Sequence, residues 1–98
     1  MSWDVRFRSK VVKQIRKLPE SLQMAVRFLV KDLQLNGPLA HYWPNFSRLQ
    51  GPKDCYHCHL RKGRPTYVAV WQVIDKDLQM IEVKYVGTHE GADYRRLC

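Results

Sequence analysis

The amino-acid sequence predicts an α+β fold, with one strand and two helices followed by three further strands. Residues 2–8 alternate apolar and charged side chains, which is typical of a strand with one face in solvent. Residues 10–36 repeat apolar side chains at helical spacing, and residues 54–86 contain three strand-like runs separated by turns. A chain of 98 residues, 45% hydrophobic, has room for one core. We therefore expect a single domain over residues 1–98, with the helices packed on one face of one sheet.

The N-terminal elements follow from local signals. Ser9 is a suitable N-cap for a helix that begins at Lys10, and Pro19 both ends this helix and suits the first position of the next. The second helix is expected from about residue 19 to Asn36, where Gly37-Pro38 stops it. The apolar stripes of the two helices consist of Val11, Val12, Ile15 and Leu18 in the first and Leu22, Ala25, Val26, Leu29 and Leu33 in the second.

The second half of the chain reads as a loop and three strands. Residues 37–53 are rich in Gly and Pro, yet their apolar side chains must dock on something; these are Tyr42, Trp43, Phe46 and Leu49. Strands are expected at about 54–61, 66–74 and 78–86, with the middle one central because it is the most apolar. They should form an antiparallel meander. In the last strand, Ile81, Val83 and Tyr85 should be buried, while Glu82 and Lys84 should be exposed. Residues 91–98 form a short polar segment.

Charge and cysteine content restrict the partners and the compartment. The net charge of +8 and pI of about 9.7 favour a polyanionic partner: RNA, DNA, an acidic protein or an anionic membrane surface. No apolar run reaches the ~18 residues of a membrane-spanning helix, and no signal-peptide segment is present, so we expect a cytoplasmic protein. Cys55 and Cys58 should point to opposite faces of one strand, and three cysteines make a poor disulfide framework. Any cross-link through Cys98 would be an artefact of oxidation in air.

The run from Cys55 to Arg61 holds the most informative residues. In a strand, His57, His59 and Arg61 share one face, which suits phosphate binding and proton transfer better than core packing. His89 follows a neighbouring strand, and Tyr94 comes soon after it. The flanking sequence is basic, with Arg48, Lys53, Lys62 and Arg64.

Two simpler interpretations compete with a catalytic one. A metal site could use Cys55, His57, Cys58 and His59, but these lack the paired C-x₂-C spacing of a zinc site, so no metal or other cofactor is expected. Alternatively, the histidines belong to a solvated sheet face with no further role. The coincidence of His57, His59, His89 and Tyr94 argues against this second interpretation.

Catalysis on a phosphodiester accounts for all of these residue types. RNA is cut without a metal when its own 2′-hydroxyl attacks phosphorus, provided that groups remove one proton and supply another. Histidine suits both tasks near neutral pH, and Arg stabilises the developing charge. His59 and His89 are the candidate proton-transfer groups, with His57 beside them, Arg61 as the phosphate clamp, and Tyr94 as a base platform or further acid/base group.

The chain resembles a known family along nearly its whole length. The matching segments are Lys17-Leu18-Pro19, Arg48–Gly51, Asp54–Arg61, Trp71–Asp75 and Gly87–Glu90 with Tyr94. They are similar to those of the RelE/ParE toxins of type II toxin–antitoxin systems, and above all to the RelE/YafQ-like mRNA interferases. The resemblance implies a RelE-like fold and a ribosome-dependent endoribonuclease that cuts mRNA in the ribosomal A site. It also implies neutralisation by a cognate antitoxin, which we expect to be acidic.

The resemblance also places individual residues. His57 and His59 lie where RelE-type toxins carry a pair of strand lysines, His89 matches the catalytic His of the YafQ-like branch, and Tyr94 matches a functional aromatic near the C-terminus. The candidate RNA-binding residues are Arg48, Lys53, Lys62, Arg64 and Tyr67. Val68 stands where RelE has an important Arg, so Arg61 or Arg64 is expected to supply the phosphate contact. The alternatives are a ParE-like toxin of the same fold, which inhibits gyrase without hydrolysis, and a non-enzymatic nucleic-acid-binding module.

Overall fold

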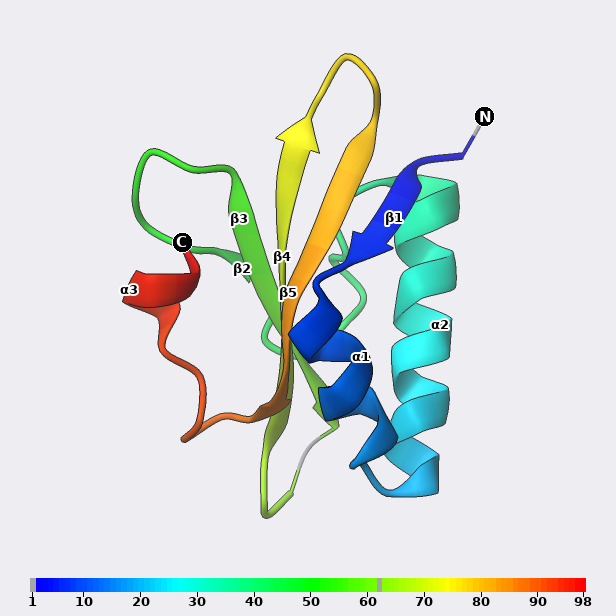
Figure 1. Cartoon of the computed structure of the whole chain (residues 1–98), viewed down its shortest axis with the longest axis vertical. Helices are drawn as coiled ribbons and strands as arrows, with labels where there is room; N and C mark the ends of the chain where they lie inside the picture. Colours follow the sequence, from blue (N-terminus) through cyan, green and yellow to red (C-terminus); the bar gives the residue numbers. More distant parts are fainter. Residues whose placement is uncertain (1, 62) are drawn as a thin grey trace.

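The computed structural model describes residues 2–61 and 63–98 and shows one five-stranded sheet with the helices α1 and α2 against one of its faces (Figure 1). The strand order is β1-β5-β4-β3-β2, with β1 parallel to β5 and all other neighbours antiparallel. In chain order the elements are β1 (Asp4–Phe7), α1 (Ser9–Arg16), α2 (Glu20–Asn36), β2 (Ser47–Arg48), β3 (Cys55–Arg61), β4 (Tyr67–Asp75), β5 (Met80–Thr88) and α3 (Tyr94–Leu97). The predicted α+β class and antiparallel meander are confirmed, and β4 is the central strand.

The helices bury their apolar stripes much as the sequence predicts, but they begin elsewhere. Ser9 lies inside α1, because the carbonyl of Arg8 already accepts the backbone N–H groups of Val11 and Val12. Pro19 similarly precedes α2 instead of opening it. Val12 was expected in the core and is exposed, since α1 meets the sheet through Val11 and the residue one turn later, Ile15.

The core lies between the helices and β3, β4 and β5. Trp71 of β4 is fully buried at its centre, and its indole N–H donates to the Pro38 carbonyl at 3.1 Å. Phe46, from the loop before β2, stacks on Tyr56 with ring centroids 5.7 Å apart. Trp43 fixes the same loop by donating to Asp32 of α2 at 2.8 Å. The expected docking is thus confirmed for Trp43 and Phe46, whereas Tyr42 is fully exposed and Leu49 is half-buried outside the core cluster.

A β-bulge in β5 changes which residues face which way. Val70 of β4 pairs with Tyr85, but the next residue, Trp71, pairs with Val83, so Lys84 is an extra residue in the strand. Lys84 and Tyr85 consequently line one cavity together, and Val86 returns to the core. The prediction that Tyr85 belongs to the core face is therefore wrong, because simple alternation fails at a bulge. The prediction that Lys84 is exposed is also wrong, because the C-terminal segment lies over it and the Leu97 carbonyl accepts a hydrogen bond from its ammonium.

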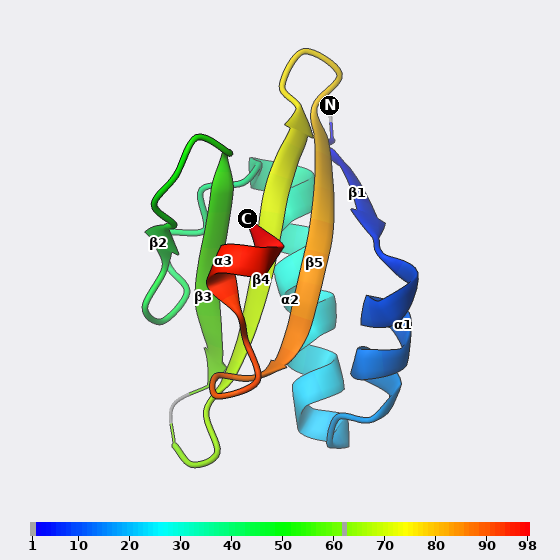
Figure 2. The ribbon, with the colours of Figure 1, turned by 60° about the vertical axis from the view of Figure 1, so that its left-hand side comes forward.

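The C-terminal segment covers the face of the sheet opposite α2. Figure 2 shows α3 lying across β3 and β4, with α2 behind the sheet. Cys98 forms a disulfide with Cys55 of β3, closing a loop with a sequence separation of 43 residues. The expectation of unpaired cysteines is corrected here: Cys55 turns toward the α3 side, while Cys58 stays free and buried on the helix side. Across residues 2–61 and 63–98, no helix has the length and apolar character needed to cross a membrane.

Candidate active site

Three histidines and one tyrosine form a closed ring of neighbouring side chains on the α3 side of the sheet. The ring centroids of His57 and His59 are 5.8 Å apart, and those of His59 and His89 are also 5.8 Å apart. Tyr94 closes the ring, at 6.2 Å from His89 and 5.5 Å from His57. We call these four side chains the histidine cluster. It joins β3, the segment after β5, and α3.

The register of the sheet explains why the two strand histidines stand side by side. His57 pairs with Val70 and His59 pairs with Val68 in the neighbouring strand β4. Both valines are fully buried, so they form an apolar floor beside the imidazoles. Val68 in turn pairs with Gly87 of β5, which leaves the face next to His59 free of a third side chain.

His89 is held in place by the packing of Tyr85 against two glycines. A Cβ atom at Gly87 would lie 2.6 Å from the Tyr85 hydroxyl, and one at Gly91 would lie 2.7 Å from it. A larger residue at either position would therefore displace the Tyr85 hydroxyl. The Tyr85 hydroxyl donates to the Thr88 carbonyl at 2.8 Å, and the backbone N–H of His89 donates to the Thr66 carbonyl at 2.8 Å. These contacts fix the backbone on both sides of the His89 imidazole.

Tyr94 owes its position to three attachments of the C-terminal segment. Asp93 caps α3 by accepting the backbone N–H of Arg96, and the Lys84 ammonium donates to the Leu97 carbonyl at 2.7 Å. The disulfide of Cys98 supplies the third attachment. The Tyr94 hydroxyl is buried, and no described residue forms a hydrogen bond with it. Buried hydroxyls usually have a partner, so this unpaired donor is an exception among the described residues.

Burial and mutual repulsion keep the strand imidazoles neutral. Burial lowers the pKa of His59, and the nearby charge of His89 lowers it further. Burial also lowers the pKa of His57, with smaller contributions from His59 and His89; a hydrogen bond with Ser47 acts in the opposite direction. Burial raises the pKa of Tyr94, so its hydroxyl keeps its proton near neutral pH. The cluster thus combines two strand imidazoles with lowered pKa values, which suit them to accept protons, and a phenol that keeps its own.

Ser47 is a contact that sequence reasoning missed. It lies in the two-residue strand β2, pairs with His57, and places its hydroxyl 3.0 Å from Nδ1 of that histidine. The contact orients the imidazole so that Nε2 is directed away from β2. The only sequence signal for it is a Ser in a Gly/Pro-rich loop, which does not reveal the β2–β3 pairing.

Arg61 does not share a face with the strand histidines, which corrects the alternation argument. The β3–β4 register shifts between His59 and Arg61, so Arg61 pairs with Tyr67. Its guanidinium lies 5.3 Å from the centre of the Tyr67 ring, and Tyr67 packs against the core on the helix side. Arg61 is therefore placed at the sheet edge, away from the histidine cluster.

The other expected RNA contacts do not belong to the histidine cluster. Arg48 pairs with the core residue Tyr56, so its side chain turns to the helix side, where it lies 3.6 Å from Asp54 and donates to the Lys53 carbonyl at 3.3 Å. Lys53 and Arg64 are exposed in loops. Lys62 lies outside the described residues. The described residues also contain no group of three or more His, Cys, Asp and Glu side chains placed to hold a metal ion.

Comparisons with known proteins agree with the resemblance seen in the sequence. No family model matches the chain. Over 97 residues it is 32% identical to a protein of Escherichia coli described as "Putative RelE-like toxin protein", covering 99% of this chain and 94% of the relative. It is 27% identical over 92 residues to "Putative toxin RelE1" of Methanocaldococcus jannaschii, covering 94% of this chain and 96% of the relative.

A solved structure gives the same result for the fold. A mutant of E. coli toxin RelE, in complex with a peptide of the antitoxin RelB, superposes with a TM-score of 0.70 at 26% identity. The match covers 99% of this chain and 90% of the RelE chain. With this fold and with 32% identity to a relative over nearly the full length of both chains, the protein belongs to the family of RelE-like toxins.

Proposed function

We propose that the protein is the toxin of a toxin–antitoxin pair and that it cleaves mRNA on the ribosome through attack of the RNA 2′-hydroxyl. The observation that carries this proposal is the histidine cluster, in which side chains from three separate segments meet. The family relationship supplies the toxin role, and the cluster supplies groups for proton transfer.

The proton steps are assigned to His59 and His89. The lowered pKa of His59 suits it to accept the proton of the 2′-hydroxyl as the oxygen bonds to phosphorus. His89 then gives a proton to the departing 5′-oxygen as the phosphorus–oxygen bond breaks, which leaves a cyclic phosphate and a 5′-hydroxyl. Burial and the charge of His89 lower the pKa of His59, so His59 is the member of the pair assigned to accept a proton.

Tyr94 and His57 complete the assignment. The unpartnered Tyr94 hydroxyl can donate to a phosphoryl oxygen, and its ring can stack on a base. His57, oriented by Ser47, lies next to both His59 and Tyr94 and can donate to the same phosphate. Arg61 and Arg64, at the end of β3 and in the loop after it, are assigned to the flanking RNA instead of the scissile phosphate. No metal or cofactor is part of this assignment.

The proposed ribosome requirement follows from how open the cluster is. His89 is exposed, and a site at the surface of a small domain controls the path of an RNA chain poorly by itself. A ribosome that holds mRNA in its A site can supply the orientation that brings the 2′-hydroxyl in line for attack.

An antitoxin is the second proposed partner. The E. coli relative of known structure is bound to a peptide of its antitoxin RelB. The net charge of +8 favours an acidic antitoxin here, because complementary charge speeds encounter and competes with RNA for the same basic surface.

The decisive experiment compares three forms of the protein expressed in growing cells: wild type, the double variant His59→Ala/His89→Ala, and the control His41→Ala. His41 is an exposed histidine in the loop before β2, outside the cluster. Wild type and control should arrest growth with cleaved transcripts, and the double variant should not. Arrest by the double variant with intact mRNA and stalled gyrase would replace this proposal with a ParE-like activity.

A further inference from the structure

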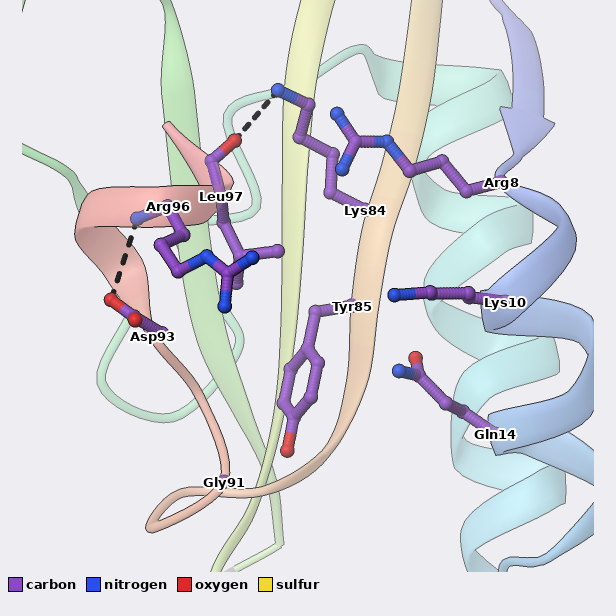
Figure 3. A pocket seen from close by; sticks show the side chains of 9 residues that line it. All are labelled: Arg8, Lys10, Gln14, Lys84, Tyr85, Gly91, Asp93, Arg96 and Leu97. Carbon is purple, nitrogen blue, oxygen red and sulfur yellow. Dashed lines mark hydrogen bonds between the residues drawn. The ribbon is translucent and has the colours of Figure 1, made fainter.

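A second site lies next to the histidine cluster, in a cavity of about 280 Å³ between α1, β5 and α3. Its charged side chains come from separated parts of the chain: Arg8 and Lys10 from the start of α1, Lys84 from β5, and Asp93 and Arg96 from the C-terminal segment. Figure 3 shows Lys10 and Gln14 projecting from α1 toward Tyr85, with Arg96 approaching from α3. Four cations thus surround this cavity against one carboxylate.

The most informative residue of the cavity is Lys84. It is only 4% exposed, and its ammonium has one described hydrogen bond, to the Leu97 carbonyl. Among the described residues, no carboxylate lies within 4 Å of this ammonium. Burying a charge without a counter-ion is costly, and an ammonium has three N–H donors, so two remain for a ligand.

The neighbouring charges increase this need for an anion. Burial lowers the pKa of Lys84, and repulsion from Arg8 and Lys53 lowers it further. The carboxylate of Glu82 raises this pKa but offsets only part of the decrease. Arg8 forms an ion pair with Glu82, with Nε and Oε1 3.2 Å apart. The other three cations of the cavity, Lys10, Lys84 and Arg96, have no acidic partner within 4 Å among the residues described.

The bulge in β5 creates the cavity and connects it to the cluster. The bulge turns Lys84 and Tyr85 to the same side of the sheet. Just beyond the bulge, the Gln14 side chain accepts a hydrogen bond from the backbone N–H of Val86 at 3.0 Å. Tyr85 separates the cavity from the cluster, since its hydroxyl packs on the two glycines that flank His89. The cavity and the histidine cluster therefore border the same side chain, that of Tyr85.

We propose that this cavity, lined by Lys10, Lys84 and Arg96, binds a backbone phosphate of the RNA strand whose scissile phosphate lies at the histidine cluster. This inference rests on the proposed ribonuclease function and adds to it a second phosphate subsite. The cations that line the cavity come from α1, β5 and α3, and a phosphate group offers several oxygens to them, whereas a single carboxylate would leave most of this positive charge unneutralised. A nucleic-acid backbone, which carries one negative charge per phosphate, matches the excess positive charge of the cavity better than a single carboxylate does.

The test measures binding without cleavage. The probe is a short RNA with 2′-methoxy groups, which cannot attack its own phosphates, and affinity is followed by fluorescence anisotropy over a range of salt concentrations. The pocket variant is Lys10→Gln/Arg96→Gln, and the control is Arg27→Gln/Lys31→Gln, two exposed basic residues of α2 with the same total charge change. Lys84→Met provides a second, internal pocket variant.

The pocket variants should bind the probe roughly tenfold more weakly than the control. The salt dependence of log K should become shallower by about 0.7 for each phosphate that the variant no longer neutralises. Equal affinities and slopes for the pocket and control variants would overturn the subsite. So would a pocket variant that loses only its affinity for the antitoxin. A wild-type protein that fails to cut programmed ribosomes would refute the proposed function instead, while a selective loss of probe binding in the pocket variants would still support the subsite.

Discussion

Replacing Tyr94 by Phe should separate stability from activity. The Tyr94 hydroxyl is buried, and no described residue bonds to it, so the folded protein bears the cost of removing it from water. An unsatisfied buried polar group costs about 1–3 kcal/mol, and Tyr94→Phe removes this cost while keeping the ring beside His57 and His89. Taking the lower end, a gain of about 1 kcal/mol raises the melting temperature of a domain of this size by about 4–8 °C.

The same change should reduce cleavage. If the hydroxyl donates to the phosphate or transfers a proton, its loss lowers the rate by about 10²-fold or more. The assays are thermal unfolding by circular dichroism and primer extension on mRNA cut in a reconstituted translation mixture. Tyr42→Phe is the matched control, because Tyr42 is fully exposed and should change neither quantity. A less stable Tyr94→Phe variant would show that the hydroxyl has a partner in solution. If the Tyr94→Phe variant cleaves mRNA at the wild-type rate, the hydroxyl has no role in cleavage and any contribution of Tyr94 comes from its aromatic ring.

Two further predictions concern pH and the disulfide. The folded-state pKa values of His57 and His59 lie below the unfolded value of about 6.5, so the unfolded chain gains protons first as the pH falls. Stability should therefore be constant above about pH 6.5, fall below it, and level off once both folded imidazoles are protonated. Urea unfolding at several pH values measures this, and a double variant His57→Gln/His59→Gln with the same pH dependence would contradict it. Cys98→Ser or a reductant should lower the free energy of unfolding by about 2–4 kcal/mol and loosen α3, since the link spans 43 residues. Melting curves with and without reductant test this, with Cys58→Ala as a control that keeps the disulfide; identical curves would show that the bond adds nothing.

The elements that the sequence predicts well are those whose pattern is long and regular. The buried positions of α2 recur every three or four residues, and the apolar run of β4 identifies the central strand. Helix starts were displaced by a residue because capping depends on where the backbone first turns, which Ser9 and Pro19 do not determine alone.

The parts that could not be predicted depend on single-residue irregularities. Bulges in β3 and β5 moved Arg61 and Tyr85 to faces that strict alternation does not give them. The helix α3 has four residues and the strand β2, which carries Ser47, has two, so neither element is long enough to show a periodic pattern in the sequence. The contact between Ser47 and His57 therefore could not be predicted. The residue types of the histidine cluster are visible in the sequence, but the distance between His59 and His89 is not, because it follows from the pairing of β3 with β4 and of β4 with β5.

The parallel pairing of β1 with β5 has a consequence for how the protein is made. The first strand cannot complete its hydrogen bonds until a strand near the other end of the chain has been synthesised, since Asp4 pairs with Met80 and Phe7 with Val83. His89 and Tyr94 come later still. A nascent chain thus cannot assemble its cluster of imidazoles and phenol until the segment that carries His89 and Tyr94 has been synthesised.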